Sequence, residues 1–193
     1  MDTSFERSPN TTDEWYTPKT IIDALGHFDL DPCAPCNRLW DTATRHITPT
    51  EDGLKADWGG KRVWLNPPYS RPLVERFIKK MVNNNNGIAL LFSRCDSKMF
   101  QDLIFPNATA LLFIRGRIKF YRPDGTQGGS SGCGSVLVSF GGNNAEALRN
   151  SSISGKVYTT KVEQKELSET STQNLTHKYL FATLILSYKY VQS

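Results

Sequence analysis

The sequence lacks long apolar runs, has few cysteines and shows no strong excess of one charge. No stretch approaches the roughly 18 apolar residues of a membrane span. The polar start, Met1–Asn10, lacks the basic and then apolar segments of a secretory signal. We therefore expect a cytoplasmic protein without membrane contact. In that compartment cysteines are usually free thiols, and the four in this chain are Cys33, Cys36, Cys95 and Cys133.

A metal site is also not expected. Cys33 and Cys36 form a Cys-x-x-Cys pair, with His27 and His46 nearby, so a zinc site can be imagined. A second pair at one of the usual zinc spacings is missing from the sequence, and we predict no metal.

Length and composition allow one domain with a sizeable core, since the chain has 193 residues of which 38% are hydrophobic. The net charge of +4 suits a polyanionic partner, although many proteins with other partners are equally basic.

Helical and strand patterns alternate along the chain. Thr17 is expected to cap a helix that starts at Pro18 and ends at Gly26, and a longer helix starts at Pro72, with Val74, Phe77, Ile78 and Met81 at helical spacing. A short helix is expected at 98–105 and a glycine-rich turn at 125–134. The expected strands are 28–30, 63–65, 88–92, 110–114, 117–121 and 135–140. This alternation predicts an α/β fold with a mostly parallel sheet, and the apolar strands predict helices on both faces.

Two polar residues follow strands of this sheet. Asp31 follows the first strand and Asn66 a later one, so both should lie on the edge where parallel strands end and where ligands bind. Only 66 − 31 = 35 residues separate them, which is short for two strand-helix units. One unit should therefore be abbreviated, in agreement with the loop-rich segment 35–62.

The apolar run 63–65 stops at Asn66-Pro67-Pro68-Tyr69. Two prolines continue neither a strand nor a helix, so the carbonyl groups here are left for a ligand. The Asn66 side-chain oxygen and the Pro67 carbonyl can accept both N–H groups of an exocyclic amine, such as N6 of adenine or a glutamine amide. Tyr69 adds a flat face for stacking of a base. A plain strand followed by a proline turn would look similar.

Further motifs occur in a fixed order around this tetrapeptide. They are Asp13-Glu14-Trp15-Tyr16-Thr17-Pro18, Phe28 to Ala34, Asp52-Gly53-Leu54, Asp57-Trp58 and Gly116 to Phe120. The series resembles the phage-type Dam family of DNA N6-adenine methyltransferases over roughly residues 13–141. This resemblance implies a Rossmann-like S-adenosylmethionine-dependent methyltransferase fold, with methyltransferase domain 1–145 and a divergent segment 146–193 that includes the apolar stretch 179–186.

The resemblance also implies a cofactor site for S-adenosylmethionine. Asp31 would bind the methionine ammonium group, with Pro32 and Ala34 close to the cofactor. Tyr16, Thr17 and Pro18 would meet the methionine carboxylate end, although they can also simply cap a helix. Asp57 and Trp58 would meet the cofactor adenine, unless they are an ordinary surface pair. The chain departs from many methyltransferases because small residues replace Gly-x-Gly after the first strand, and no acid for the ribose stands out.

Double-stranded DNA is the expected partner. A target base must be flipped out of the stack, and cations must hold the backbone phosphates. A hairpin around residues 115–122 would supply most of them, unless its charges are ordinary surface charges. The candidate DNA-binding residues are Arg71, Arg115, Arg117, Lys119 and Arg122.

We thus expect a monomeric, phage- or prophage-encoded enzyme that methylates adenine N6 in DNA. The resemblance implies a short palindromic target such as GATC. RNA adenine methylation, protein glutamine methylation and a catalytically inactive DNA-binding relative are the alternatives. A glutamine methyltransferase fits less well, because its Gly-rich cofactor loop and amino-terminal helical domain are missing here.

Overall fold

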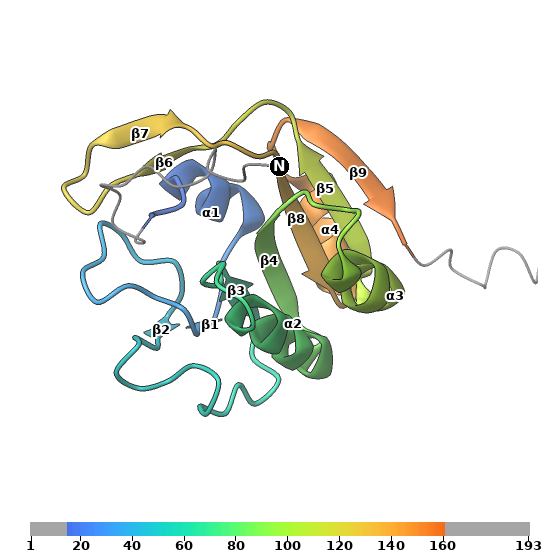
Figure 1. The fold of residues 1–193 in the computed structure, drawn as a ribbon, viewed down its shortest axis with the longest axis horizontal. Helices are drawn as coiled ribbons and strands as arrows, with labels where there is room; N and C mark the ends of the chain where they lie inside the picture. The colour runs from blue at the N-terminus through green and yellow to red at the C-terminus, as the bar shows by residue number, and fades with distance from the viewer. Residues whose placement is uncertain (1–14, 161–193) are drawn as a thin grey trace, which may run out of the picture. The chain divides into compact units, whose positions relative to one another are not determined.

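The computed structural model describes residues 15–160, which form a central sheet with the strand order β2-β1-β3-β4-β8-β5-β9 (Figure 1). Its strands are β1 (Leu30–Asp31), β2 (Arg45–His46), β3 (Val63–Leu65), β4 (Gly87–Phe92), β5 (Ala110–Ile114), β8 (Ser135–Phe140) and β9 (Gly155–Thr159). A separate two-stranded sheet pairs β6 (Lys119–Tyr121) with β7 (Gln127–Ser130).

Most strands of the central sheet point the same way. β2, β1, β3 and β4 are parallel neighbours, and β5 has the same direction because β8 runs antiparallel to both β4 and β5. β9 is antiparallel to β5 at one side of the sheet. The structure agrees with the expected α/β class, and β8 and β9 are the departures from parallel pairing. We call the edge where β1, β3, β4 and β5 end the carboxyl edge.

Helices cover both faces of the sheet. They are α1 (Lys19–Leu25), α2 (Leu73–Asn84), the π-helical turn η2 (Met99–Ile104), α3 (Phe105–Asn107) and α4 (Gly142–Asn150). Val63 and Leu65 pack with α2 and η2 in one cluster, whereas Trp64 between them packs with α1 and α4 in the other. The prediction of a sheet buried on both faces is confirmed, and the four apolar residues predicted for α2 are its buried residues.

Three local predictions were wrong. Thr17 does not cap α1, since the helix begins after Pro18 and has no side-chain cap. The first strand starts at Leu30 rather than Phe28. The segment 125–134 is not only a turn, because residues 127–130 form β7 against β6. Gly128 makes this strand possible, since a Cβ there would lie 2.5 Å from the Trp15 ring.

The chain between β1 and β3 is abbreviated, as expected. It contains only the two-residue strand β2 and otherwise turns and loops. Backbone hydrogen bonds hold this segment against the end of β1, from Ile47 N to Asp31 O at 2.8 Å and from Ala34 N to Ile47 O at 3.1 Å.

The sheet continues beyond residue 145, where the sequence places the end of the methyltransferase domain. α4 spans that position, and β9 pairs with β5 along its whole length. The remainder of the segment 146–193, from residue 161 onward and including 179–186, lies outside the described residues. No helix within 15–160 is long and apolar enough to cross a membrane.

Candidate active site

Asp31 and Asn66 lie at the ends of neighbouring strands. Asp31 is the last residue of β1, Asn66 directly follows β3, and the two strands pair in parallel with Leu30 opposite Val63. β2 lies on the other side of β1, so the chain changes direction across the sheet at this point. Open α/β sheets bind ligands at such switch points, outside the carboxyl ends of the strands. The predicted shared edge is confirmed.

The Asp31 carboxylate is buried and held by two donors. Its residue is 4% exposed. Cys33 N donates to Oδ1 at 2.9 Å, and the Thr42 hydroxyl donates to Oδ2 at 2.5 Å. Both oxygens are thereby fixed in place before any ligand arrives.

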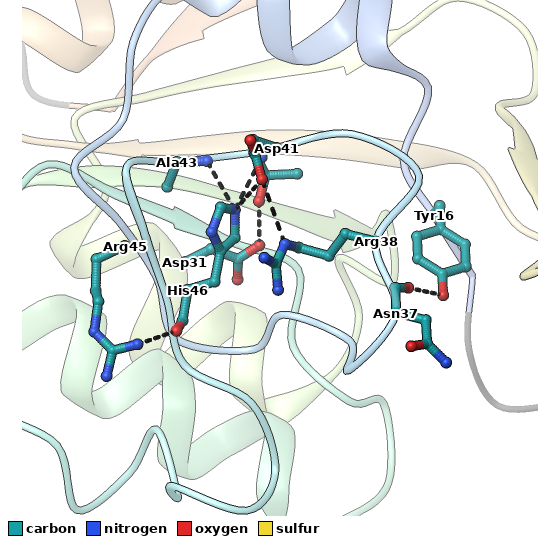
Figure 2. A network of polar contacts seen from close by, with 9 residues as sticks. Tyr16, Asp31, Asn37, Arg38, Asp41, Ala43, Arg45 and His46 are labelled. Carbon is teal, nitrogen blue, oxygen red and sulfur yellow. Dashed lines mark hydrogen bonds and ion pairs between the residues drawn. The ribbon is translucent and has the colours of Figure 1, made fainter.

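His46 orders the loop that carries Thr42 (Figure 2). Its Nε2 accepts hydrogen bonds from the backbone N–H groups of Thr42 and Ala43, at 3.2 and 3.3 Å. Burial lowers the pKa of His46, and the nearby Arg38 lowers it further. The imidazole is therefore neutral at pH 7 and acts as an acceptor. Figure 2 shows the side chains of Asp31, Arg38, Asp41 and His46 gathered around this loop.

Burial raises the pKa of Asp31 from 3.8 to about 6, although the Thr42 and Cys33 hydrogen bonds and the Arg38 charge oppose the shift. Three stabilising contacts thus compensate only part of the cost of burial. A cation bound beside the carboxylate would compensate the rest. Burial also raises the pKa of the Cys33 thiol, so this cysteine is not an activated nucleophile.

The segment 16–18 is attached to the same loop. The Tyr16 hydroxyl donates to the Asn37 carbonyl, and Trp40 Nε1 donates to the Thr17 carbonyl at 3.1 Å. Thr17 is 4% exposed, and its buried hydroxyl has no hydrogen-bond partner in the described part of the chain. Since the loop that holds Thr17 also carries Thr42 of the Asp31 site, the structure brings these predicted cofactor residues together.

Pro32 and Ala34 are closely packed, and the turn at 52–58 lies against them. Ala34 is 1% exposed. A Cβ on Gly53 would lie only 2.0 Å from the Pro32 carbonyl oxygen, so only glycine allows the observed approach. The turn itself is held by Lys80, whose ammonium group donates to the carbonyls of Gly53, Leu54 and Ala56.

Asp57 and Trp58 differ in their surroundings. Trp58 is 2% exposed, packs in the core, and donates its indole N–H to Gly53 O at 2.9 Å. It is therefore not half of a surface pair and supports the turn. Asp57 is exposed and accepts a hydrogen bond from Gly59 N at 2.9 Å.

Asn66 presents an unused acceptor. Its Oδ1 is buried and has no hydrogen-bond partner among residues 15–160. An unpaired buried amide oxygen is costly, roughly 1–3 kcal/mol, so a native structure keeps one where a ligand supplies the donor. Pro67 next to it is buried, whereas Pro68 is exposed.

Phe92, which sequence analysis did not identify, supports the ring of Tyr69. The two rings are stacked, with centroids 4.1 Å apart and planes at 25°. The Tyr69 hydroxyl donates to Leu90 O at 3.1 Å, and its burial raises the pKa of Tyr69. The residue remains 39% exposed, which leaves ring surface for a second aromatic partner.

The hairpin β6–β7 carries cations beside the cofactor segment. Lys119 lies in β6, and Arg117 and Arg122 lie just before and just after this strand. All three are exposed, as are Arg71 and Arg115 elsewhere at the surface. Tyr121 exchanges two backbone hydrogen bonds of 3.0 Å with Tyr16, and its ring meets Trp40 edge-on at 5.1 Å. In Figure 1 the hairpin stands apart from the central sheet, close to α1.

Arg117 is placed at the end of β4. A Cβ on Gly134 would lie 2.7 Å from Ser93 Oγ and 3.2 Å from Arg117 Nη1, so these three residues pack together. Ser93 directly follows Phe92. One predicted DNA-binding cation therefore lies close to the strand end that supports Tyr69.

Sequence analysis missed Thr42, His46, Gly53 and Phe92 as site residues. Gly53 stands in one of the ordered motifs, and Phe92 ends a predicted strand whose carboxyl end must meet that of β3. Thr42, His46 and Gly53 lie in a segment without periodicity, of which only the two-residue β2 is regular.

The four cysteines are free. Within the described range no three His, Cys, Asp or Glu side chains gather as a metal site would require.

An α/β sheet with polar groups gathered at its switch point is the architecture of enzymes that bind nucleotide-like ligands. The profile of the family described as DNA N-6-adenine-methyltransferase (Dam) matches residues 6–172. The chain belongs to this family.

Two curated relatives carry the name DNA N-6-adenine-methyltransferase. The protein of Haemophilus phage HP1 (strain HP1c1) is 33% identical over 128 residues, which is 62% of this chain and 73% of the relative. The protein of Escherichia phage T1 is 34% identical over 115 residues, which is 53% of this chain and 44% of the relative. No solved structure matches the chain.

Asp31→Asn is expected to stabilise the ligand-free protein. The folded carboxyl binds its proton more tightly than the unfolded one, so stability falls as pH rises from about 4 through about 6. Above that range the ionised group costs about 3 kcal/mol, which the neutral amide avoids. Urea unfolding at pH 5 and pH 8 should show a larger gain at pH 8. Equal gains at both values would contradict the raised pKa.

Gly53→Ala is expected to destabilise the protein by about 1–3 kcal/mol, because the methyl group must displace the Pro32 backbone. Thermal unfolding measures this loss. Gly132→Ala is the matched control, since a Cβ there meets nothing within 4 Å. Equal melting temperatures for the two variants would show that the turn moves freely.

Proposed function

We propose that the protein is a site-specific enzyme that transfers a methyl group from S-adenosylmethionine to N6 of adenine in double-stranded DNA. It would act as a monomer in the cytoplasm of a bacterial host, as a phage or prophage protein, and its sheet would be the Rossmann-like methyltransferase fold. The observation that carries the proposal is the unpaired, buried Asn66 Oδ1 on the strand next to the buried carboxylate of Asp31.

The residues around Asp31 suit the amino-acid end of the methyl donor. Asp31 would bind the ammonium group, because a buried carboxylate with a raised pKa gains from a neighbouring cation. The buried, unpartnered Thr17 hydroxyl would donate to the carboxylate, with Tyr16 and Pro18 fixing its position. Pro32 and Ala34 would line the site, and Asp57 would accept from the cofactor adenine on the turn that Trp58 supports.

Asn66 and Pro67 would hold the acceptor amine. When bound, S-adenosylmethionine supplies an electrophilic sulfonium methyl group. Asn66 Oδ1 and the Pro67 carbonyl each accept one N–H of the adenine amino group, which leaves the nitrogen lone pair directed away from both. Pro67 and Pro68 fix the backbone here, so that alignment requires little reorganisation.

Tyr69 would stack on the flipped adenine with the ring surface that Phe92 does not cover. Stacking of a base on an aromatic side chain contributes about 1–3 kcal/mol. This gain offsets part of the cost of extruding the base from the duplex, which is a few kcal/mol.

Cations near the carboxyl edge would hold the DNA backbone. Arg117 lies at the end of β4, and the hairpin is joined to the cofactor segment through Tyr16 and Tyr121. Phosphate contacts by exposed side chains position the duplex without reading its sequence. The proposed set is Arg71, Arg115, Arg117, Lys119 and Arg122.

The family match does not favour the alternatives. An inactive relative would have no use for an unpaired Asn66 oxygen. An RNA or a protein glutamine methyltransferase would use the same acceptor geometry. Only an experiment with DNA, RNA and protein substrates therefore identifies the acceptor. The target sequence, for which GATC is our expectation, would follow from the methylated positions.

Purified protein incubated with methyl-labelled S-adenosylmethionine and unmethylated duplex DNA should yield labelled N6-methyladenine, detected by nucleoside mass spectrometry. Asn66→Ala should abolish the transfer while calorimetry shows cofactor affinity within about twofold of the wild type, because Asn66 holds only the acceptor.

Asn150→Ala is the matched control, since Asn150 is exposed at the end of α4. Parallel reactions with RNA and with protein substrates separate the alternatives. Normal turnover by Asn66→Ala would rule out the acceptor role, and label in RNA or protein alone would rule out DNA as substrate.

Cofactor binding should weaken at low pH. Asp31 must be ionised to bind an ammonium group, so wild-type affinity for S-adenosylmethionine should fall about tenfold per pH unit below about 6. Asp31→Asn should bind weakly, with an affinity that changes little between pH 5 and pH 8. Calorimetric titrations across this range compare the two proteins. The same pH profile for both would exclude Asp31 as the ammonium ligand.

A further inference from the structure

An open hollow of about 730 Å³ lies over one face of the paired strands β5 and β9, and β9 is the edge strand at the right of the sheet in Figure 1. It is lined by Phe113, Arg115, Ser154, Gly155, Lys156 and Tyr158. Most of these residues lie beyond position 145, in the segment for which sequence analysis found no role.

The strand register explains why these side chains share one face. Phe113 is paired with Lys156 across the two strands, and Tyr158 is two residues further along β9. Side chains two apart on a strand point to the same face, and so do those of paired residues. Arg115 is two residues after Phe113. Its backbone N–H donates to Ser154 O at 2.8 Å, which extends the strand pairing beyond β5.

The hollow combines two cations with an exposed aromatic ring. Arg115 and Lys156 are exposed. No carboxylate of residues 15–160 lies within 4.0 Å of either cationic group, so neither forms an ion pair there. Tyr158 is 59% exposed, and its ring meets Phe113 edge-on at 5.9 Å. Phe113 thus fixes one side of the ring and leaves most of it to solvent.

The hollow is continuous with the proposed DNA-binding residues. Arg115 follows the end of β5 at the carboxyl edge, and only Gly116 separates it from Arg117. Because β9 is antiparallel to β5, its first residues, including Lys156, lie at this same edge.

We propose that this hollow is a binding subsite for one backbone phosphodiester of the DNA duplex, at the far end of the surface that contacts the DNA. Arg115 and Lys156 hold the phosphate between them, and the Tyr158 ring packs against the adjoining deoxyribose. The inference rests on the proposed function, because it assigns a further part of the same DNA to this strand.

An extended polyanion fits this hollow better than a small free anion. The hollow is open, its two cations are exposed, and it lies on a line with Arg117 along the carboxyl edge. Exposed cations contribute to binding mainly by releasing counterions from a polyanion, which makes the contact depend strongly on salt.

Lys156→Gln tests the assignment. Fluorescence anisotropy with an unmethylated duplex should show a several-fold higher Kd at low salt, and a slope of log K against log salt smaller by about one. The turnover number at saturating DNA should stay within about twofold of the wild type, while the KM for DNA rises. Lys156→Arg should retain most of the affinity.

Lys79→Gln is the matched control, because Lys79 is exposed on α2, away from the hollow. Unchanged cofactor affinity shows that each variant is folded. If Lys156→Gln has the wild-type Kd and salt slope, or a raised Kd with an unchanged slope, the phosphate subsite is wrong. A wrong subsite can be distinguished from a wrong proposed function, because in the second case the wild-type protein itself methylates no DNA.

Discussion

The burial of the Asp31 carboxylate is the constraint on which the site depends. The carboxylate lies at the carboxyl edge because Asp31 ends the two-residue strand β1. The loop after that strand donates a hydrogen bond to each of its two oxygens. His46 holds the backbone of that loop as a neutral acceptor. The absence of a helix between β1 and β3 in the described chain follows from this arrangement: the segment is ordered by polar contacts to one buried charge instead of by an apolar face. Its stability is therefore tied to whatever cation the carboxylate binds.

The order of strands in the sheet sets the order of functional groups along its edge. β1 ends at Asp31, Asn66 directly follows β3, and β4 ends at Phe92, and these strands are successive neighbours. Neighbouring strands are about 4.8 Å apart, so each group is held within one or two strand spacings of the next. Asp31, Asn66 and Phe92 thus lie in a row along the carboxyl edge, and under the proposed function this row would order the ammonium ligand, the amine acceptor and the support for the stacking ring.

The sequence was sufficient to predict the elements that are buried on a regular period. α2, β4, β5 and β8 lie where their apolar patterns place them, and the shared edge of Asp31 and Asn66 follows from strand alternation. The direction of β8 was not predictable, because a continuous apolar strand has no directional signal, and β9 was not predicted because it is mostly exposed and polar. The helix cap predicted at Thr17 and the surface alternative for Trp58 were wrong for one reason: the burial of these residues depends on partners, Trp40 and Gly53, that only the folded loop brings to them.

Charge is sorted along the carboxyl edge by burial. The anionic end, at β1, is buried and enclosed by hydrogen bonds, so under the proposed function it would favour a small cation that can give up its water. The cationic end, from Arg117 to Lys156, is exposed and remains hydrated, which suits a polyanion that exchanges counterions without entering the protein. Between them lies Asn66, whose amide is neutral. A neutral amide at this position suits an uncharged amine. A carboxylate in place of Asn66 would compete with Asp31 for the cation, and a cationic side chain would repel that cation. Under the proposed function, the cofactor ammonium group and the DNA backbone would thus bind at opposite ends of the carboxyl edge, with the adenine amine held between them at Asn66 Oδ1.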